Sequence, residues 1–81
     1  MATPEQEREL NAQIDQSLSS AAAVLRGVQN RSLTREQESA VAQVQSFIRQ
    51  AREIRVSDLP AARSLAQRAA ILAGDLAASL R

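Results

Sequence analysis

Residues 58–80 read DLPAARSLAQRAAILAGDLAASL, and this stretch decides the fold. Its larger and smaller apolar residues recur three or four positions apart, at Leu59, Ala62, Leu65, Ala69, Leu72, Leu76 and Leu80. That spacing places them on one face of an α-helix, with Ala66 and Ala73 widening the face on one side. Asp58 is positioned to cap the helix and Pro60 falls in its first turn. The pattern predicts a helix over about residues 59–80.

Two earlier helices begin with nearly the same signal, Thr3-Pro4-Glu5-Gln6 and Thr34-Arg35-Glu36-Gln37. In each, the threonine caps the helix and the glutamine three positions later bonds back to it, which is a capping box. The first helix is predicted over residues 4–28 from apolar positions at Leu10, Ile14, Leu18, Ala21, Leu25 and Val28.

The second helix is predicted over residues 35–56 and carries a broader apolar stripe. Its members are Ala40, Val41, Val44, Phe47, Ile48, Ala51 and Ile54. A stripe of this width is expected to contact two neighbouring helices at once.

Short connections between the helices force neighbours to run antiparallel. We therefore predict one domain, residues 1–81, of the all-α class: an up-down-up antiparallel three-helix bundle with long helices and a rod-like shape. Charge placement suggests which ends meet. Glutamates at 5, 7 and 9 open the first helix, and Arg49, Arg52 and Arg55 close the second. Both sets suit the local helix dipole, and antiparallel packing is expected to bring them together.

The composition argues against catalysis. The chain has no His and no Cys, so nucleophile–base pairs and the usual zinc ligands are missing. We expect no enzyme activity, no catalytic or metal-binding residues and no cofactor. A formal net charge of +1 with a single aromatic residue does not predict nucleic acid as a partner.

The apolar fraction is 44%, but much of it is alanine, so the core is expected to be only marginally stable. No apolar run is long enough to span a membrane, and the first residues lack the features of a signal peptide. Localisation is left open between the cytoplasm and the bacterial envelope, the latter being periplasmic if a signal segment was removed.

Two surfaces are candidate binding sites. The first is the row Arg49, Arg52 and Arg55, which is either an anion or phosphate clamp, extended by Arg63 and Arg68, or a set of dipole-matching charges that pair with acidic neighbours. The second lies on the third helix outside its apolar seam and comprises Ala70, Ile71, Gly74, Ala77 and Ala78. Its small residues would let another helix approach closely, although alanine is also simply a good helix former on an exposed surface.

Two resemblances add expectations. The spacing of Asp58, Leu59, Ala62, Leu65, Ala66, Ala69 and Leu72 resembles the helical hairpin of tetratricopeptide-like repeats. Over about residues 33–76, the elements Leu33-Thr34-x-Glu36-Gln37, Ser46-Phe47-Ile48, Ala51 and Asp58 are similar to the Ala/Leu/Arg-rich helical domain of uncharacterised bacterial envelope-associated proteins. The second resemblance implies an envelope-associated helical module and identifies no site.

From these observations we predict a non-catalytic helical interaction or structural module that binds a partner protein or itself and forms an oligomer in the latter case. The alternative is anion or nucleic-acid binding through the arginine row of the second helix.

Overall fold

The structure is a computed structural model that describes residues 3–80, so the ends of the predicted domain at residues 1–2 and 81 lie outside it. The described chain forms three helices, α1 (Pro4–Val28), α2 (Arg35–Ile54) and α3 (Leu59–Ser79), and no strand. The predicted all-α three-helix bundle is confirmed. Helix α2 ends two residues before the predicted position, because residues 55–57 form a turn that leaves Val56 90% exposed.

The predicted caps start each helix. In the first capping box the backbone N–H of Gln6 donates to Thr3 Oγ1 at 3.1 Å, and the Thr3 N–H donates to Gln6 Oε1 at 2.9 Å. Thr34 and Gln37 form the same pair of bonds at 3.1 and 2.9 Å. Asp58 Oδ1 accepts from the Ala61 N–H at 3.0 Å. These bonds satisfy donors that a helix N-terminus otherwise leaves unpaired, and they fix where each helix begins.

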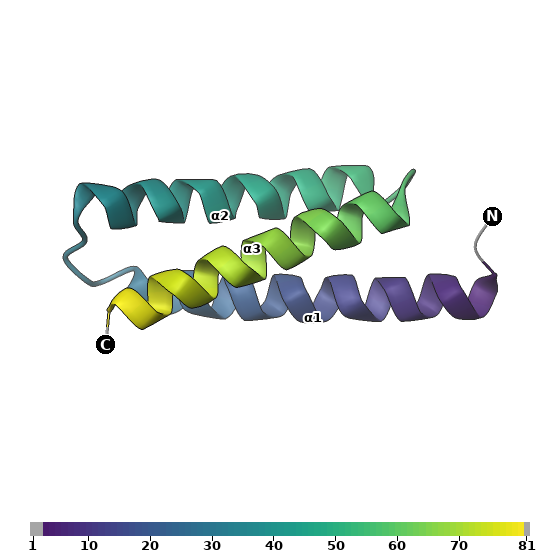
Figure 1. The fold of residues 1–81 in the computed structure, drawn as a ribbon, viewed down its shortest axis with the longest axis horizontal. Coiled ribbons are helices and arrows are strands. Elements are labelled where there is room, and N and C mark those ends of the chain that lie inside the picture. The colour runs from purple at the N-terminus through teal and green to yellow at the C-terminus, as the bar shows by residue number, and fades with distance from the viewer. Residues whose placement is uncertain (1–2, 81) are drawn as a thin grey trace.

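Helix α3 holds the other two helices together. It crosses diagonally between them and packs against both, whereas α1 and α2 contact each other very little (Figure 1). Helix α2 contacts two neighbours as expected, but very unequally. Helix α3 is the one that packs extensively against two others, because its small side chains let a helix approach from either side. The molecule measures 45 × 18 × 16 Å with a radius of gyration of 13.5 Å. A compact chain of this length would have a radius of about 12 Å, so the predicted rod shape is confirmed.

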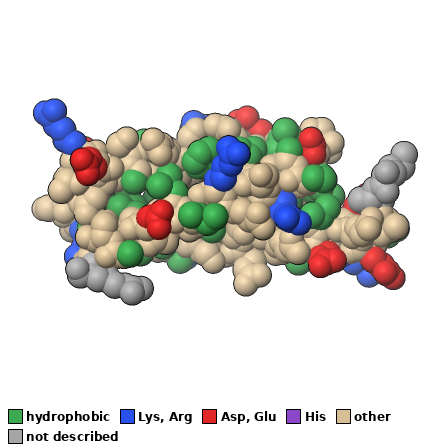
Figure 2. Space-filling model, viewed as in Figure 1, with side chains coloured by type: hydrophobic (Ala, Val, Ile, Leu, Met, Phe, Trp, Pro, Cys, Tyr) green, Lys and Arg blue, Asp and Glu red, His purple; other side chains and the backbone are tan. Residues whose placement is uncertain are grey.

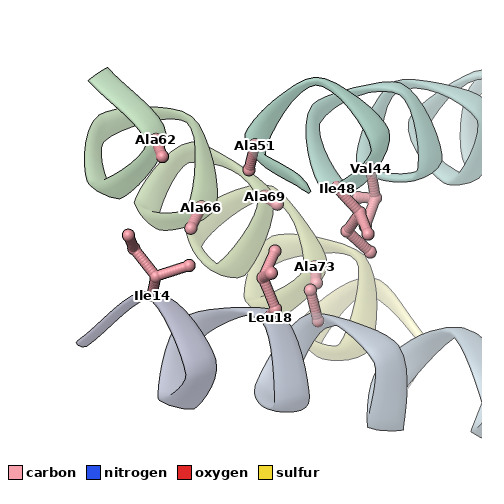
Figure 3. Close-up of a cluster of buried hydrophobic side chains, with 10 residues drawn as sticks. Ile14, Leu18, Val44, Ile48, Ala51, Ala62, Ala66, Ala69 and Ala73 are labelled. Carbon is pink, nitrogen blue, oxygen red and sulfur yellow. The ribbon is translucent and has the colours of Figure 1, made fainter. Parts of the chain in front are cut away.

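The core is built around a row of α3 side chains. The buried residues of α3 are Ala62, Ala66, Ala69, Ala73 and Leu76. Side chains from α1 and α2, among them Ile14, Leu18, Val44 and Ile48, point toward these alanines (Figure 3). The predicted seam included Leu65 and Leu72, with Ala66 and Ala73 only widening it, but the two leucines are half-buried and the two alanines are buried. The difference follows from packing, because alanines take the positions where two helices come closest and leucines reach sideways from the edges.

The expected meeting of the glutamates at 5, 7 and 9 with the arginine row does not occur. Helix α1 extends past the ends of its neighbours, so its first turns lie beyond the end of α2 (Figure 1). Arg55 instead reaches Asp15, with 2.6 Å between Arg55 Nη2 and Asp15 Oδ1. Its guanidinium also donates to the side-chain and backbone oxygens of Asn11 at 3.0 and 3.3 Å. Within residues 3–80 this is the one ion pair.

The opposite end of the rod is fixed by polar contacts to α3. Arg31, in the connection between α1 and α2, donates to the carbonyl oxygen of Leu80 at 3.1 Å. Gln37 in the first turn of α2 donates to Ser79 Oγ at 3.2 Å. A cation beside the last carbonyls of a helix is favourable because those carbonyls carry partial negative charge.

We expect Ala66→Leu to destabilise the fold by about 1–3 kcal/mol, because the added atoms have no space between α3 and its neighbours. Ala66 is completely buried. Urea denaturation followed by circular dichroism measures the change. Ala23→Leu is the matched control, since Ala23 is exposed on α1 and should change stability very little. Equal stability of the two variants would show that the alanine row is not closely packed.

The contact between Arg55 and Asp15 should be measurable in a double-mutant cycle. Arg55→Gln and Asp15→Asn, singly and together, are expected to give a coupling of about 0.5–1 kcal/mol, as for a partly exposed ion pair. The coupling should shrink in 1 M salt because the charges are then screened. A cycle between Arg49→Gln and Asp15→Asn serves as the control. A coupling no larger than that of the control would contradict this contact.

Candidate functional site

A groove runs between α1 and α2, and none of its lining residues comes from α3. Its central part has a volume of about 600 Å³. On one side it is lined by Ala22, Leu25 and Arg26 of α1 and by Gln29, which follows the last residue of α1; on the other side it is lined by Gln45, Ile48, Arg49, Arg52 and Glu53 of α2. The groove exists because α3 separates α1 and α2 while covering them from one side only.

Two further depressions share residues with this central part and lengthen it. One, of about 490 Å³, shares Ala22 and both Arg26 and Arg52, and extends to Asp15 and Arg55. The other, of about 250 Å³, extends toward the connection between the helices. It shares Leu25, Gln29 and Gln45, and adds Val28, Leu33 and Val41. From Asp15 to Gln29 the rise along α1 is about 21 Å, roughly four helical turns.

The groove combines an apolar floor with cationic edges. Ile48 is buried, and Ala22 and Leu25 are half-buried, so part of the surface of each of these last two faces the groove. Arg26 from α1 and Arg49 from α2 are exposed on opposite sides. This arrangement suits binding through apolar contact with charged contacts at the margin.

The predicted arginine row is divided by the structure. Arg49 and Arg52 line the central groove, and Arg26 joins them from α1. Arg55 is held by Asp15, so its charge is already balanced. The two additional candidates lie elsewhere: Arg63 lines a depression with Glu9 and Pro60, while Arg68 is exposed on α3 and lines none of the three depressions of the groove.

The second predicted surface is open over part of its area. Ile71 is 67% exposed, Gly74 and Ala78 are exposed, and Ala70 and Ala77 are half-buried. A Cβ added to Gly74 would meet no atom of another helix within 4 Å, so no neighbouring element packs against it. Figure 2 views the molecule from the α3 side, where apolar side chains form several small groups separated by charged and polar surface.

Sequence reasoning missed the part of the groove that α1 contributes. Ala22, Leu25, Arg26 and Gln29 follow the spacing i, i+3, i+4 and i+7, and so do Gln45, Ile48, Arg49 and Arg52 on α2. This shared spacing was available as a signal. It identifies a site only once the uncovered side of α1 and α2 is known, and that depends on the position of α3.

Other site chemistry is limited in the described chain. Within residues 3–80, no three acidic side chains come together in a way that could hold a metal ion. No helix in that range combines the length and apolar character needed to cross a membrane.

No protein-family model, curated protein or solved structure matches this chain. The two resemblances to helical proteins therefore stay expectations.

Proposed function

We propose that this chain is a non-catalytic interaction module that binds a helix of a partner protein in the groove between α1 and α2. The observation that carries this proposal is the apolar floor that α3 leaves uncovered between the two helices. The resemblance to bacterial envelope-associated proteins supports placing this module at the cell envelope.

The shape of the groove favours a helix as the occupant. Helix α2 has an apolar stripe broad enough for two neighbours, but α3 covers only one side of it. The half-buried Val41 lines the other side together with Leu25 of α1, and the small exposed part of Ile48 reaches the central groove. A helix laid along this side would complete a four-helix arrangement, in which each helix contacts two others through such stripes.

The second candidate function is anion or nucleic-acid binding, which the clustering of Arg26, Arg49 and Arg52 favours. The composition of the groove supports it less well. No aromatic side chain lines the central groove, so bases have no stacking surface there, and Glu53 stands among the arginines. Binding of a single-stranded oligonucleotide that falls steeply with added salt and is lost on replacing these arginines would support this alternative.

The test uses an amphipathic helical peptide of about 18 residues, which spans about 27 Å and so covers the groove. Its apolar stripe is leucine and its remaining positions are glutamine and alanine. We expect binding by fluorescence anisotropy, and we expect Ala22→Tyr to weaken it about tenfold, equivalent to about 1.4 kcal/mol, because the ring fills the groove.

Ala23→Tyr is the matched control, since Ala23 neighbours Ala22 but does not line the groove. It should bind the peptide as tightly as the unmodified protein. Equal weakening by both substitutions, or no binding by the unmodified protein, would rule out the groove as a helix-binding site.

A further inference from the structure

We infer that the helix taken up by the groove is acidic: a partner helix whose apolar stripe is flanked by glutamate or aspartate. This inference rests on the proposed helix-binding function and adds the charge of the partner. The juxtaposition that carries it is Arg26 on α1 opposite Arg49 and Arg52 on α2, with Leu25 and Ile48 between them.

The charges that line the central groove are unbalanced. Three arginines line it against one acidic residue, Glu53. In the adjoining depression Arg55 and Asp15 neutralise each other at 2.6 Å and contribute no excess. The chain as a whole has a formal net charge of only +1, so the excess of positive charge in the groove is local. A helix with acidic edges would place carboxylates beside these guanidinium groups while its apolar stripe covers the floor.

The same charges argue against a second copy of the chain as the occupant. In a two-fold symmetric pair, the same surface of each chain meets the other. Facing grooves would therefore bring Arg26, Arg49 and Arg52 of one chain toward the same arginines of its partner. Like charges in an interface oppose association, so a separate acidic partner fits better.

The ends of the groove differ, which constrains the partner further. Toward the connection between α1 and α2 the lining includes Leu33, Val28 and Val41, together with Glu38 and Arg31. The arginine excess lies in the central part and not at this end. The expected partner helix therefore carries its acidic residues along the segment over the central groove and needs none over this end, where Arg31 and Glu38 balance each other in charge.

Three versions of the test peptide separate the effect of flanking charge on binding from the effect of the apolar stripe. They share the leucine stripe and carry glutamate, glutamine or lysine at the flanking positions over the central groove. We expect the glutamate peptide to bind about tenfold more tightly than the glutamine peptide and the lysine peptide to bind most weakly, as several screened charge pairs would give. The difference in affinity between the glutamate and lysine peptides should decrease in 0.5 M salt, because the charges are then screened.

A charge-reversed protein supplies the matching experiment. Arg26, Arg49 and Arg52 are all changed to glutamate, which should make the lysine peptide the preferred ligand. The control changes Arg8, Arg35 and Arg68 to glutamate; these are exposed, lie outside the groove and give the same net charge. This control should keep the preference for the glutamate peptide. Circular dichroism checks that both variants keep their helical content.

The outcomes separate the two proposals. If all three peptides bind equally and Ala22→Tyr weakens each of them, the helix-binding function stands and the acidic partner is wrong. If none binds, both proposals fail. If the control changed at Arg8, Arg35 and Arg68 loses the preference for the glutamate peptide as completely as the groove variant does, the preference depends on net charge and not on the groove, and the acidic partner is wrong. A dimer seen by light scattering that Ala22→Tyr disrupts would mean that a second copy fills the groove, which also overturns the inference.

Discussion

The close approach of α3 to both other helices is the contact on which the structure depends. Alanine has the smallest side chain that still favours a helix, so a row of alanines lets two backbones come near one another without a glycine's cost in chain entropy. Ala62, Ala66 and Ala69 are completely buried in this row. Because α1 and α2 each gain most of their tertiary contact from α3, neither would be held in place without it.

This contact also explains why the molecule has a groove. A three-helix bundle whose helices all touch equally buries its three apolar stripes against one another. Here α3 lies between the other two and keeps them apart, so the far edges of the stripes on α1 and α2 remain uncovered. Leu25 and Ile48 therefore belong to two surfaces: part of each packs toward the core, and part lines the groove. Arg26, Arg49 and Arg52 lie beside this partly apolar surface.

The local parts of the fold could be predicted because their causes are local. Both capping boxes and the Asp58 cap are bonds between residues three positions apart, so they can be recognised in the sequence. The predicted helix starts are confirmed. The partner of Arg55 could not be predicted in the same way. It depends on how far α1 extends past α2, which α3 sets by packing on both helices. The buried row of α3 differs from the predicted seam for the same reason. One apolar face of α3 packs against two neighbours, so alanines and not Leu65 and Leu72 are buried.

Only the part of the candidate site on α2 could be predicted from the sequence. Arg49 and Arg52 form a row on one helix that the sequence predicts, but the residues that face them across the groove lie twenty or more positions earlier in the chain. The spacing within either helix does not show that these residues face each other across a groove that α3 leaves open. The exposure of Ile71 on α3 could be predicted, because whether a residue lies outside an apolar seam depends on the spacing within one helix alone.

The unequal helix contacts have a consequence for the order in which the chain assembles. Helices α2 and α3 are joined by a short turn and pack on each other directly, so their contacts are local and can form early. Helix α1 has little to hold it on α2 alone and gains its contacts only once α3 is in place. We therefore expect the α2–α3 hairpin to form first and α1 to dock last. In native-state hydrogen exchange, the amides of α1 would be the first to open.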